Sequence, residues 1–341
     1  MKIGRIERLS PEGPRPRTVV VNPAAEVVVD VQRAEQERLL AAGDSPEAAL
    51  RKARAIIPDS LSEGLGSASF KADLARAMES EPPADAVIGF ADATWLPALD
   101  PPRFRDFMAF ERHHVEARRV LGRPVPAVTY ELPTYYKGNP LTLVADGATV
   151  DWPGYSQWID FELELGLVLG GGGVDLCPEE AGRLVFGVTL LNDLSARDRQ
   201  FHEASGNLGP AKGKDFATAV GPWITTVDEL DLRAIPMSAS VNGERWALGS
   251  SGEMMWSVGE IVAYLSTAEP LIPGELIGTG TMGGGCGLEL ERKLAPGDVV
   301  EIEAEGIGLL RTKIGPSRPL RWEPPARTPG RTIADVTPDR S

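Results

Sequence analysis

Cysteine and histidine are scarce in this sequence of 341 residues. Its two cysteines, Cys177 and Cys286, are too few for a disulfide framework, and no C-x-x-C pair or Cys/His cluster has the spacing of a zinc site. Chains with few cysteines are typical of reducing compartments. We therefore expect a reduced, cytoplasmic protein. Cys286 has no histidine near it in sequence, so we do not expect it to act as a nucleophile.

Positive charge and long apolar runs are also lacking. The chain has 35 lysine and arginine residues against 49 aspartate and glutamate residues, a formal net charge of −14. Nucleic acids and anionic membranes attract basic surfaces, so neither is an expected partner. No apolar run of roughly 18 residues is present, and residues 1–5 lead into polar, proline-rich sequence that does not resemble the core of a signal peptide.

The remaining composition is that of an ordinary globular protein, with 42% hydrophobic residues and enough length for one large domain or two. The first part, residues 1–100, is expected to be an accessory region with short strands at 18–22 and 26–31 and helices at 32–42, 46–56 and 70–78. Residues 104–316 predict many short strands and few helices, and contain the candidate catalytic residues. The last part, 317–341, is rich in proline and arginine and predicts an extended tail.

The most informative stretch, residues 158–169, alternates apolar and acidic side chains. Side chains two residues apart share one face of a strand, so Glu162 and Glu164 would lie side by side, about 6.5–7 Å apart. Two neighbouring carboxylates repel each other unless a cation lies between them. A solvated face of an antiparallel sheet would show the same alternation, but the segment that follows favours a cation site.

That segment places Asp193 directly after an apolar strand. Ser195 and Asp198 have the spacing of a capping box, which predicts that a helix begins there. Asp193 would then lie at the corner between strand and helix, a usual place for a metal-binding or catalytic carboxylate. Together with Glu162 and Glu164 it provides three oxygen donors, which suit Mg²⁺ or Mn²⁺, with Ca²⁺ as an alternative.

Two of the three histidines lie in residues 104–119, which predict a helix at least in their second half. On a helix, His113 and Glu116 would be neighbours at positions i and i+3. A carboxylate beside an imidazole fixes its tautomer and raises its basicity, so the pair is a candidate base for activating water. The alternative is a surface helix crosslinked by ion pairs, because Glu111 and several arginines lie in the same region.

Several motifs occur in a fixed order along residues 104–316. They are the Glu-x-Glu pair at 162–164, the Asn-Asp-Leu-Ser-Ala-Arg-Asp-Arg-Gln segment at 192–200, the Gly-Pro-Ala-Lys-Gly-Lys-Asp segment at 209–215 and the Gly-Thr-Gly segment at 278–280. In this combination the chain resembles the fumarylacetoacetate hydrolase superfamily. The resemblance implies a β-rich α+β fold, in which a mixed β-sandwich or β-roll catalytic domain is joined to a smaller N-terminal α/β part.

The resemblance also implies an activity. The expected enzyme is a homodimeric, divalent-metal-dependent hydrolase that cleaves a C–C bond in a small 1,3-diketo or acylpyruvate-type acid. Decarboxylation, isomerisation and the dehydration or hydration of 2-oxo acids are alternatives, because the family carries out these reactions through the same metal-enolate chemistry. An alternative of another class is a non-catalytic, metal-dependent binding protein, for which the support is Met108 and the glycine-rich loop at 282–287.

Individual roles follow from the matching positions. Asp106 would be a further metal ligand, and Lys214 and Gln200 would stabilise charge on the substrate oxygens. The substrate contacts implied by the resemblance are Arg197, Tyr136, Lys137, Thr218 and Thr279.

The partner of His113 is a separate question, because the hydrolase that names the family supplies a glutamate from an acid-bearing insert after the Gly-Thr-Gly segment. No glutamate lies between Glu275 and Glu289 in this chain. Glu116 is therefore expected to be the partner of His113.

Overall fold

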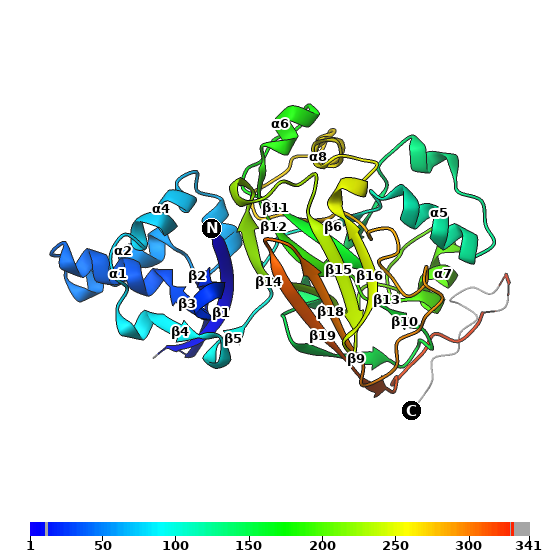
Figure 1. The fold of residues 1–341 in the computed structure, drawn as a ribbon, viewed down its shortest axis with the longest axis horizontal. Coiled ribbons are helices and arrows are strands. Elements are labelled where there is room, and N and C mark those ends of the chain that lie inside the picture. The colour runs from blue at the N-terminus through cyan, green and yellow to red at the C-terminus, as the bar shows by residue number, and fades with distance from the viewer. Residues whose placement is uncertain (11–12, 328, 331–341) are drawn as a thin grey trace.

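The computed structural model describes residues 1–10, 13–327 and 329–330. Within these residues the strands form a twelve-stranded sheet, a five-stranded sheet and a two-stranded ribbon. Most helices lie around the edges of the sheets (Figure 1). The fold is a β-rich α+β fold, as the sequence predicts. Among the described residues, no helix has both the length and the apolar character needed to cross a membrane.

The N-terminal region contributes strands to the large sheet and a group of helices beside them (Figure 1). Its strands are β1 (Lys2–Ser10), β2 (Gly13–Asn22), β3 (Val27–Asp30), β4 (Val87–Gly89) and β5 (Thr94–Trp95). Its helices are α1 (Val31–Ala41), α2 (Pro46–Ile56), α3 (Leu61–Leu65) and α4 (Phe70–Ala77). The side chains of Asp30 and Ser45 cap the first turns of α1 and α2. The predicted elements are confirmed to within a few residues, except that β2 begins earlier.

The N-terminal strands and the rest of the chain share one sheet. β1 pairs antiparallel with β14 (Thr218–Thr226), with Ile3 opposite Ile224. The two parts also share an apolar core, in which Ile3 and Leu74 pack in the same cluster as Leu276. The N-terminal region therefore packs directly on the part of the chain that contains the candidate site.

The five-stranded sheet packs against the part of the twelve-stranded sheet that comes from residues 104–318. The larger one runs in the order β4-β3-β2-β1-β14-β12-β11-β17-β6-β7, and the smaller one in the order β16-β15-β18-β19-β9. Leu165 and Leu167 from the larger sheet share a buried cluster with Ile302 and Leu310 from the smaller one. The remaining strands are β6 (Phe104–Phe107), β7 (Tyr135–Gly138), β8 (Leu143–Val144), β9 (Ala148–Pro153), β10 (Ile159–Asp160), β11 (Leu163–Leu169), β12 (Val185–Asn192), β13 (Ser195–Ala196), β15 (Pro236–Val241), β16 (Glu244–Ser250), β17 (Leu276–Gly278), β18 (Val299–Ala304) and β19 (Gly308–Arg318).

The helices of this part are short. They are α5 (Glu111–Val120), α6 (Pro178–Gly182), α7 (Arg197–Ala204) and α8 (Val258–Ser266). Single 3-10 turns cover Pro23–Ala25, Ala84–Ala86, Phe90–Asp92, Ala127–Tyr130, Pro140–Thr142, Val227–Glu229 and Ser251–Glu253. Residues 319–327 contain no helix or strand. Residues 328 and 331–341 of the predicted tail lie outside the described residues.

Two predicted elements are divided in the structure. The first half of 104–119 is strand β6, which pairs with β17 and β7, and only the second half is helix α5. The stretch 158–169 forms β10 and β11, because the chain leaves the ribbon at Phe161 before it joins the large sheet at Leu163. Glu162 lies at this break and forms an isolated bridge with Cys286.

The predicted capping box is wrong. Ser195 lies in β13, where its Oγ donates to the backbone oxygen of Asp193 at 3.1 Å. The carboxylate of Asp198 instead accepts hydrogen bonds from Ser156 Oγ and the backbone N–H of Gln157. Helix α7 therefore begins at Arg197 without a side-chain cap, and Asp198 ties it to the loop before β10.

Candidate active site

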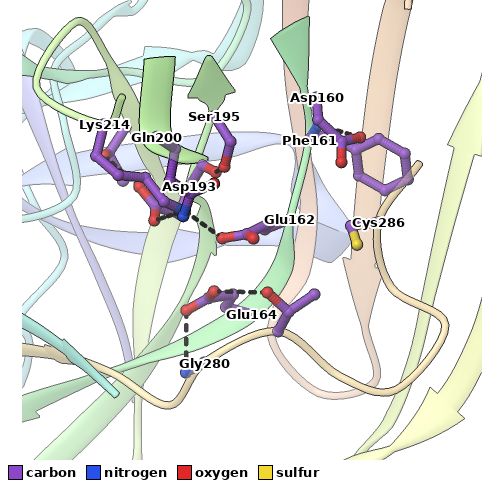
Figure 2. A network of polar contacts seen from close by, with 12 residues as sticks. Asp160, Phe161, Glu162, Glu164, Asp193, Ser195, Gln200, Lys214, Gly280 and Cys286 are labelled. Atoms are coloured by element: carbon purple, nitrogen blue, oxygen red, sulfur yellow. Dashed lines mark hydrogen bonds and ion pairs between the residues drawn. The ribbon is translucent and has the colours of Figure 1, made fainter. Parts of the chain in front are cut away.

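Three carboxylates from different strands meet at one end of the large sheet. Asp106 lies in β6 opposite Gly278 of β17, Glu164 lies in β11, and Asp193 directly follows β12. One oxygen from each lies within 4.8 Å of the other two, and all three side chains are buried. Figure 2 shows Glu164 and Asp193 in this cluster. Sheet pairing therefore brings together residues that are far apart in the sequence.

The cluster carries more negative charge than the residues around it neutralise. Burial raises the pKa of Asp106 and Glu164 well above its usual value, and the neighbouring carboxylates raise it further. Burial also raises the pKa of Asp193, although Lys214 opposes this. Oδ1 of Asp106 is buried and has no hydrogen-bond partner among the described residues.

A divalent cation fits this donor set. An oxygen-rich group of buried carboxylates is the environment that Mg²⁺, Mn²⁺ and Ca²⁺ prefer, and the unpartnered oxygen of Asp106 is available as a ligand. Without such a cation, repulsion and burial favour protonation of some of these groups. Asp106, Glu164 and Asp193 are therefore the residues that could hold the ion.

Glu162 borders the cluster and is held by two cationic side chains. Its Oε1 accepts from Nη1 of Arg197 at 2.8 Å, and its Oε2 accepts from Nζ of Lys214 at 2.5 Å. Although burial opposes ionisation, Lys214 and Arg197 lower the pKa of Glu162. Lys214 also forms an ion pair with Asp193, so it links Glu162 to the cluster (Figure 2). The predicted metal contact of Glu162 remains a prediction.

Arg197 and Gln200 both line the cavity, but Arg197 is already engaged. Its Nε donates to Oδ2 of Asp160 at 2.8 Å, and its Nη1 donates to Glu162 and to Oε1 of Gln200. This guanidinium is buried and forms ion pairs with Asp160 and Glu162, so it neutralises carboxylates inside the protein. Arg197 orients Glu162 and Gln200, and its predicted bond to a substrate carboxylate remains a prediction.

Two predicted substrate contacts instead bind Asp193. The hydroxyl of Tyr136 donates to Oδ2 at 2.8 Å, and the hydroxyl of Thr218 donates to Oδ1 at 3.0 Å. Burial raises the pKa of Tyr136 well above its usual value, so the phenol stays a donor. The two hydroxyls fix the orientation of Asp193, and Tyr136 also lines the cavity.

The expected pair between His113 and Glu116 does not form. Nδ1 of His113 lies 2.7 Å from Oε1 of Glu289, and both side chains are buried. Glu116 lies one turn along α5 on a more exposed face, where Arg119 donates to it at 2.8 Å. The glutamate beside His113 is thus Glu289, which follows the glycine-rich loop at 282–287. The glycine-rich segment before it was the available signal, because such a loop can fold back to helix α5.

Two further predicted substrate contacts are not placed on the cavity. Lys137 in β7 is exposed and is not among the residues that line the cavity. The hydroxyl of Thr279 faces the backbone and accepts the N–H of Leu165 at 3.3 Å. Two residues later, Thr281 lines the cavity and donates to Glu164 at 3.2 Å, a contact that the sequence analysis missed.

The carboxylates and His113 line one cavity of about 330 Å³. This volume suits a small organic acid. Arg118 and Arg123 also line its wall. The neighbouring Arg119 forms an ion pair with a glutamate, whereas Arg118 and Arg123 form none with the described part of the chain.

Comparisons with known proteins find relatives over most of this chain. Residues 103–315 match a family model described as fumarylacetoacetate (FAA) hydrolase C-terminal. An uncharacterised protein of Staphylococcus aureus (strain USA300) is 32% identical over 233 residues, which cover 67% of this chain and 75% of the relative.

Solved structures share the fold over nearly the whole chain. A fumarylacetoacetate hydrolase from Exiguobacterium antarcticum has a TM-score of 0.66 at 25% identity, over 93% of this chain and 100% of that one. A 2-hydroxyhepta-2,4-diene-1,7-dioate isomerase from Mycobacterium marinum has a TM-score of 0.63 at 24% identity, over 93% and 98%.

Proposed function

Because this chain belongs to the fumarylacetoacetate hydrolase family, we propose that it is a divalent-metal-dependent hydrolase that cleaves a C–C bond in a small 1,3-diketo acid. The observation that carries the proposal is the buried His113–Glu289 pair, which lies at the same cavity as the three-carboxylate cluster. A base beside a cation site is the arrangement needed to activate water against a polarised carbonyl.

The pair defines which nitrogen acts as the base. If Nδ1 carries the proton and donates it to Glu289, Nε2 has a free lone pair. Nε2 takes a proton from water, and the water oxygen forms a bond to the substrate carbonyl carbon. The adjacent C–C bond then breaks, and its electron pair passes to the neighbouring oxo group as an enolate. The proton on Nε2 finally moves to the departing carbon, which restores the neutral imidazole.

The remaining site residues bind and orient. Gln200 lines the cavity and can donate from its amide nitrogen, since its Oε1 already accepts from Arg197. Lys214 places a positive charge beside Asp193 and Glu162. A cation on Asp106, Glu164 and Asp193 would supply Lewis-acid polarisation of the substrate oxygens. We also propose that the protein is a homodimer.

The charge of the cavity wall supports a substrate with a second carboxylate. In a chain with a net charge of −14, two arginines without ion-pair partners among the described residues are a distinctive local feature. Arg118 is half-buried on α5 and Arg123 is exposed just beyond it. A dicarboxylate could place one end near the cation site and the other near these guanidiniums. Acylpyruvates that end in a carboxylate have this shape.

Product analysis by NMR tests the proposal. The protein, loaded with Mg²⁺ or Mn²⁺, would be given an acylpyruvate with a terminal carboxylate, its methyl-terminated analogue, oxaloacetate, and a 2-hydroxy-diene dioate. Cleavage of the acylpyruvate into two acids, lost in His113→Ala, is the expected result. Double-bond migration or decarboxylation without cleavage would place the enzyme among the isomerases or decarboxylases of the family. No turnover at all would favour a binding protein.

A further inference from the structure

A second group of metal-ligating side chains lies beside the first. Nδ1 of His113, Sγ of Cys286 and Oε1 of Glu289 lie within 4.8 Å of one another, and all three side chains are buried. Oε1 is 2.7 Å from Nδ1 and 3.3 Å from Sγ. The proposed hydrolysis uses His113 and Glu289 but gives no role to Cys286. The thiol is therefore an unexplained member of the group.

The donor atoms of this group differ from those of the carboxylate cluster. One nitrogen, one sulfur and one oxygen are the ligand types of Zn²⁺ and Cd²⁺, whereas Mg²⁺ and Mn²⁺ prefer oxygen. Zn²⁺ binds such ligands at about 2.0–2.3 Å, which places neighbouring donors of a tetrahedron roughly 3.3–3.8 Å apart. The observed separations require only small side-chain movements to reach that geometry.

The loop that holds Cys286 and Glu289 is fixed by its own hydrogen bonds. Oε2 of Glu289 accepts the N–H of Gly284 at 2.7 Å, which leaves Oε1 turned toward the other two donors. Asp160 accepts the N–H groups of Gly287 and Leu288 at 2.7 and 2.9 Å. A Cβ at Gly287 would lie 2.5 Å from Oδ1 of Asp160, so the close approach requires glycine.

The third donor connects this loop to the cavity. His113 also lines the cavity wall, so the group lies directly behind the site that is proposed to admit substrate. The backbone of Cys286 bridges that of Glu162, which places the group next to the carboxylates (Figure 2). A water molecule from the cavity could complete a four-coordinate shell.

We propose that His113, Cys286 and Glu289 form a second, thiolate-containing metal site that takes Zn²⁺ or Cd²⁺ and switches the enzyme off. Binding exchanges the Sγ–H bond for an Sγ–metal bond and releases that proton to solvent. The imidazole binds through Nδ1, so its single proton moves to Nε2. Nε2 then has no lone pair to accept a proton from water. Only the inhibition rests on the proposed hydrolysis, because metal binding does not require turnover.

Cadmium titration tests the site without reference to activity. The protein is held in a large excess of Mg²⁺, which favours occupation of the oxygen cluster, and Cd²⁺ is added while the ultraviolet thiolate-to-cadmium charge-transfer band is recorded. One equivalent of Cd²⁺ should produce the band in the wild type. Cys286→Ser should abolish it, and Cys177→Ser, which alters the exposed second cysteine, should retain it. A band that survives in Cys286→Ser, or no band in the wild type, overturns the proposal.

Two further measurements test the metal site independently of the cadmium band. Glu289→Gln replaces the anionic carboxylate ligand by a neutral amide and should weaken Cd²⁺ binding at least about 10-fold in calorimetry. This measurement decides the case if Cys286→Ser fails to fold. With an active substrate in hand, Zn²⁺ should inhibit the wild type and Cys177→Ser equally, and Cys286→Ser at least about 10-fold less. If no substrate is turned over, the proposed hydrolysis fails while the cadmium band still decides the metal site.

Discussion

Nδ1 of His113 lies 2.7 Å from Oε1 of Glu289, although 176 positions separate the two residues in the chain. Their partner atoms are fixed from both sides, because His113 belongs to helix α5 and Glu289 is held by the N–H of Gly284. The pair gives the cavity one base with a defined orientation. The proposed hydrolysis depends on the location of this pair beside the carboxylate cluster.

Replacing Glu289 should reduce turnover, whereas replacing Glu116 should not. Glu289→Gln keeps the size of the side chain but removes the charge that holds the Nδ1–H tautomer and stabilises the protonated imidazole. General base catalysis typically contributes about 10²–10⁴-fold, so we expect kcat to fall by at least about 10²-fold with little change in KM. Steady-state kinetics on the cleaved acylpyruvate would measure this.

Glu116→Gln is the matched control, since it makes the same chemical change on the same helix as His113 but at a side chain paired with Arg119. It should leave kcat within about 2-fold, as is usual for a surface ion pair. Equal losses in the two variants would contradict the assignment of Glu289.

Arg118 and Arg123 should control the choice between mono- and dicarboxylates. A charge-assisted hydrogen bond contributes about 1.5–3 kcal/mol, so Arg118→Ala should lower kcat/KM for a dicarboxylate by about 10–100-fold. The loss should appear mainly in KM, because this contact is distant from the bond that breaks. The methyl-terminated analogue should be affected far less.

Lys137→Ala is the control for removing a positive charge near the site. The side chain of Lys137 is exposed and lies outside the cavity, so its loss should change neither substrate by more than about 2-fold. If Lys137→Ala discriminates between the substrates as strongly as Arg118→Ala, long-range attraction and not direct contact is responsible.

Asp160 should matter for stability more than any exposed acid. It accepts hydrogen bonds from Arg197 and from the loop N–H groups of Gly287 and Leu288. Breaking a buried ion pair typically costs about 3–5 kcal/mol, so Asp160→Asn should lower the free energy of unfolding by about 3 kcal/mol. Urea denaturation in the presence of a chelator would measure this. Glu244→Gln, which alters an exposed pair with Arg292, should have little effect.

The sequence predicted the parts of the site that depend on local patterns. Alternation located Glu164 in β11, although Glu162 lies just before that strand, and the end of an apolar strand located Asp193. Family resemblance added Asp106 and Lys214, which the structure brings next to them. Each of these positions was predicted either from a short periodic pattern or from a matching motif.

The remaining contacts could not be predicted because they depend on tertiary structure. Glu289 and His113 are 176 positions apart in the chain, and the glycine-rich segment before Glu289 does not specify where its loop packs. The motif match for Lys137 also does not specify side-chain exposure, and the structure places this side chain outside the cavity lining. The sequence distance between Cys286 and His113 likewise concealed that they are neighbours in space.

The last prediction concerns pH and follows from the raised pKa of Asp106 and Glu164. Above the unfolded-state pKa of about 4, the metal-free folded protein holds protons on these groups that the unfolded chain has lost. Their contribution to stability is therefore fully present below about pH 4 and is lost as pH rises through the folded-state pKa. The lowered pKa of Glu162 acts in the opposite direction, since its contribution is lost only as pH falls below the unfolded-state value.

A bound cation displaces the protons from Asp106 and Glu164, so metal affinity should rise with pH. Asp106→Asn should flatten the fall in Tm of the metal-free protein as pH rises above about 4, and it should reduce the increase in Tm caused by Mn²⁺. Glu305→Gln, at an exposed position, should retain both behaviours. Differential scanning calorimetry with chelator or with Mn²⁺ would measure them, and a metal-induced stabilisation that is unchanged in Asp106→Asn would exclude Asp106 from the site.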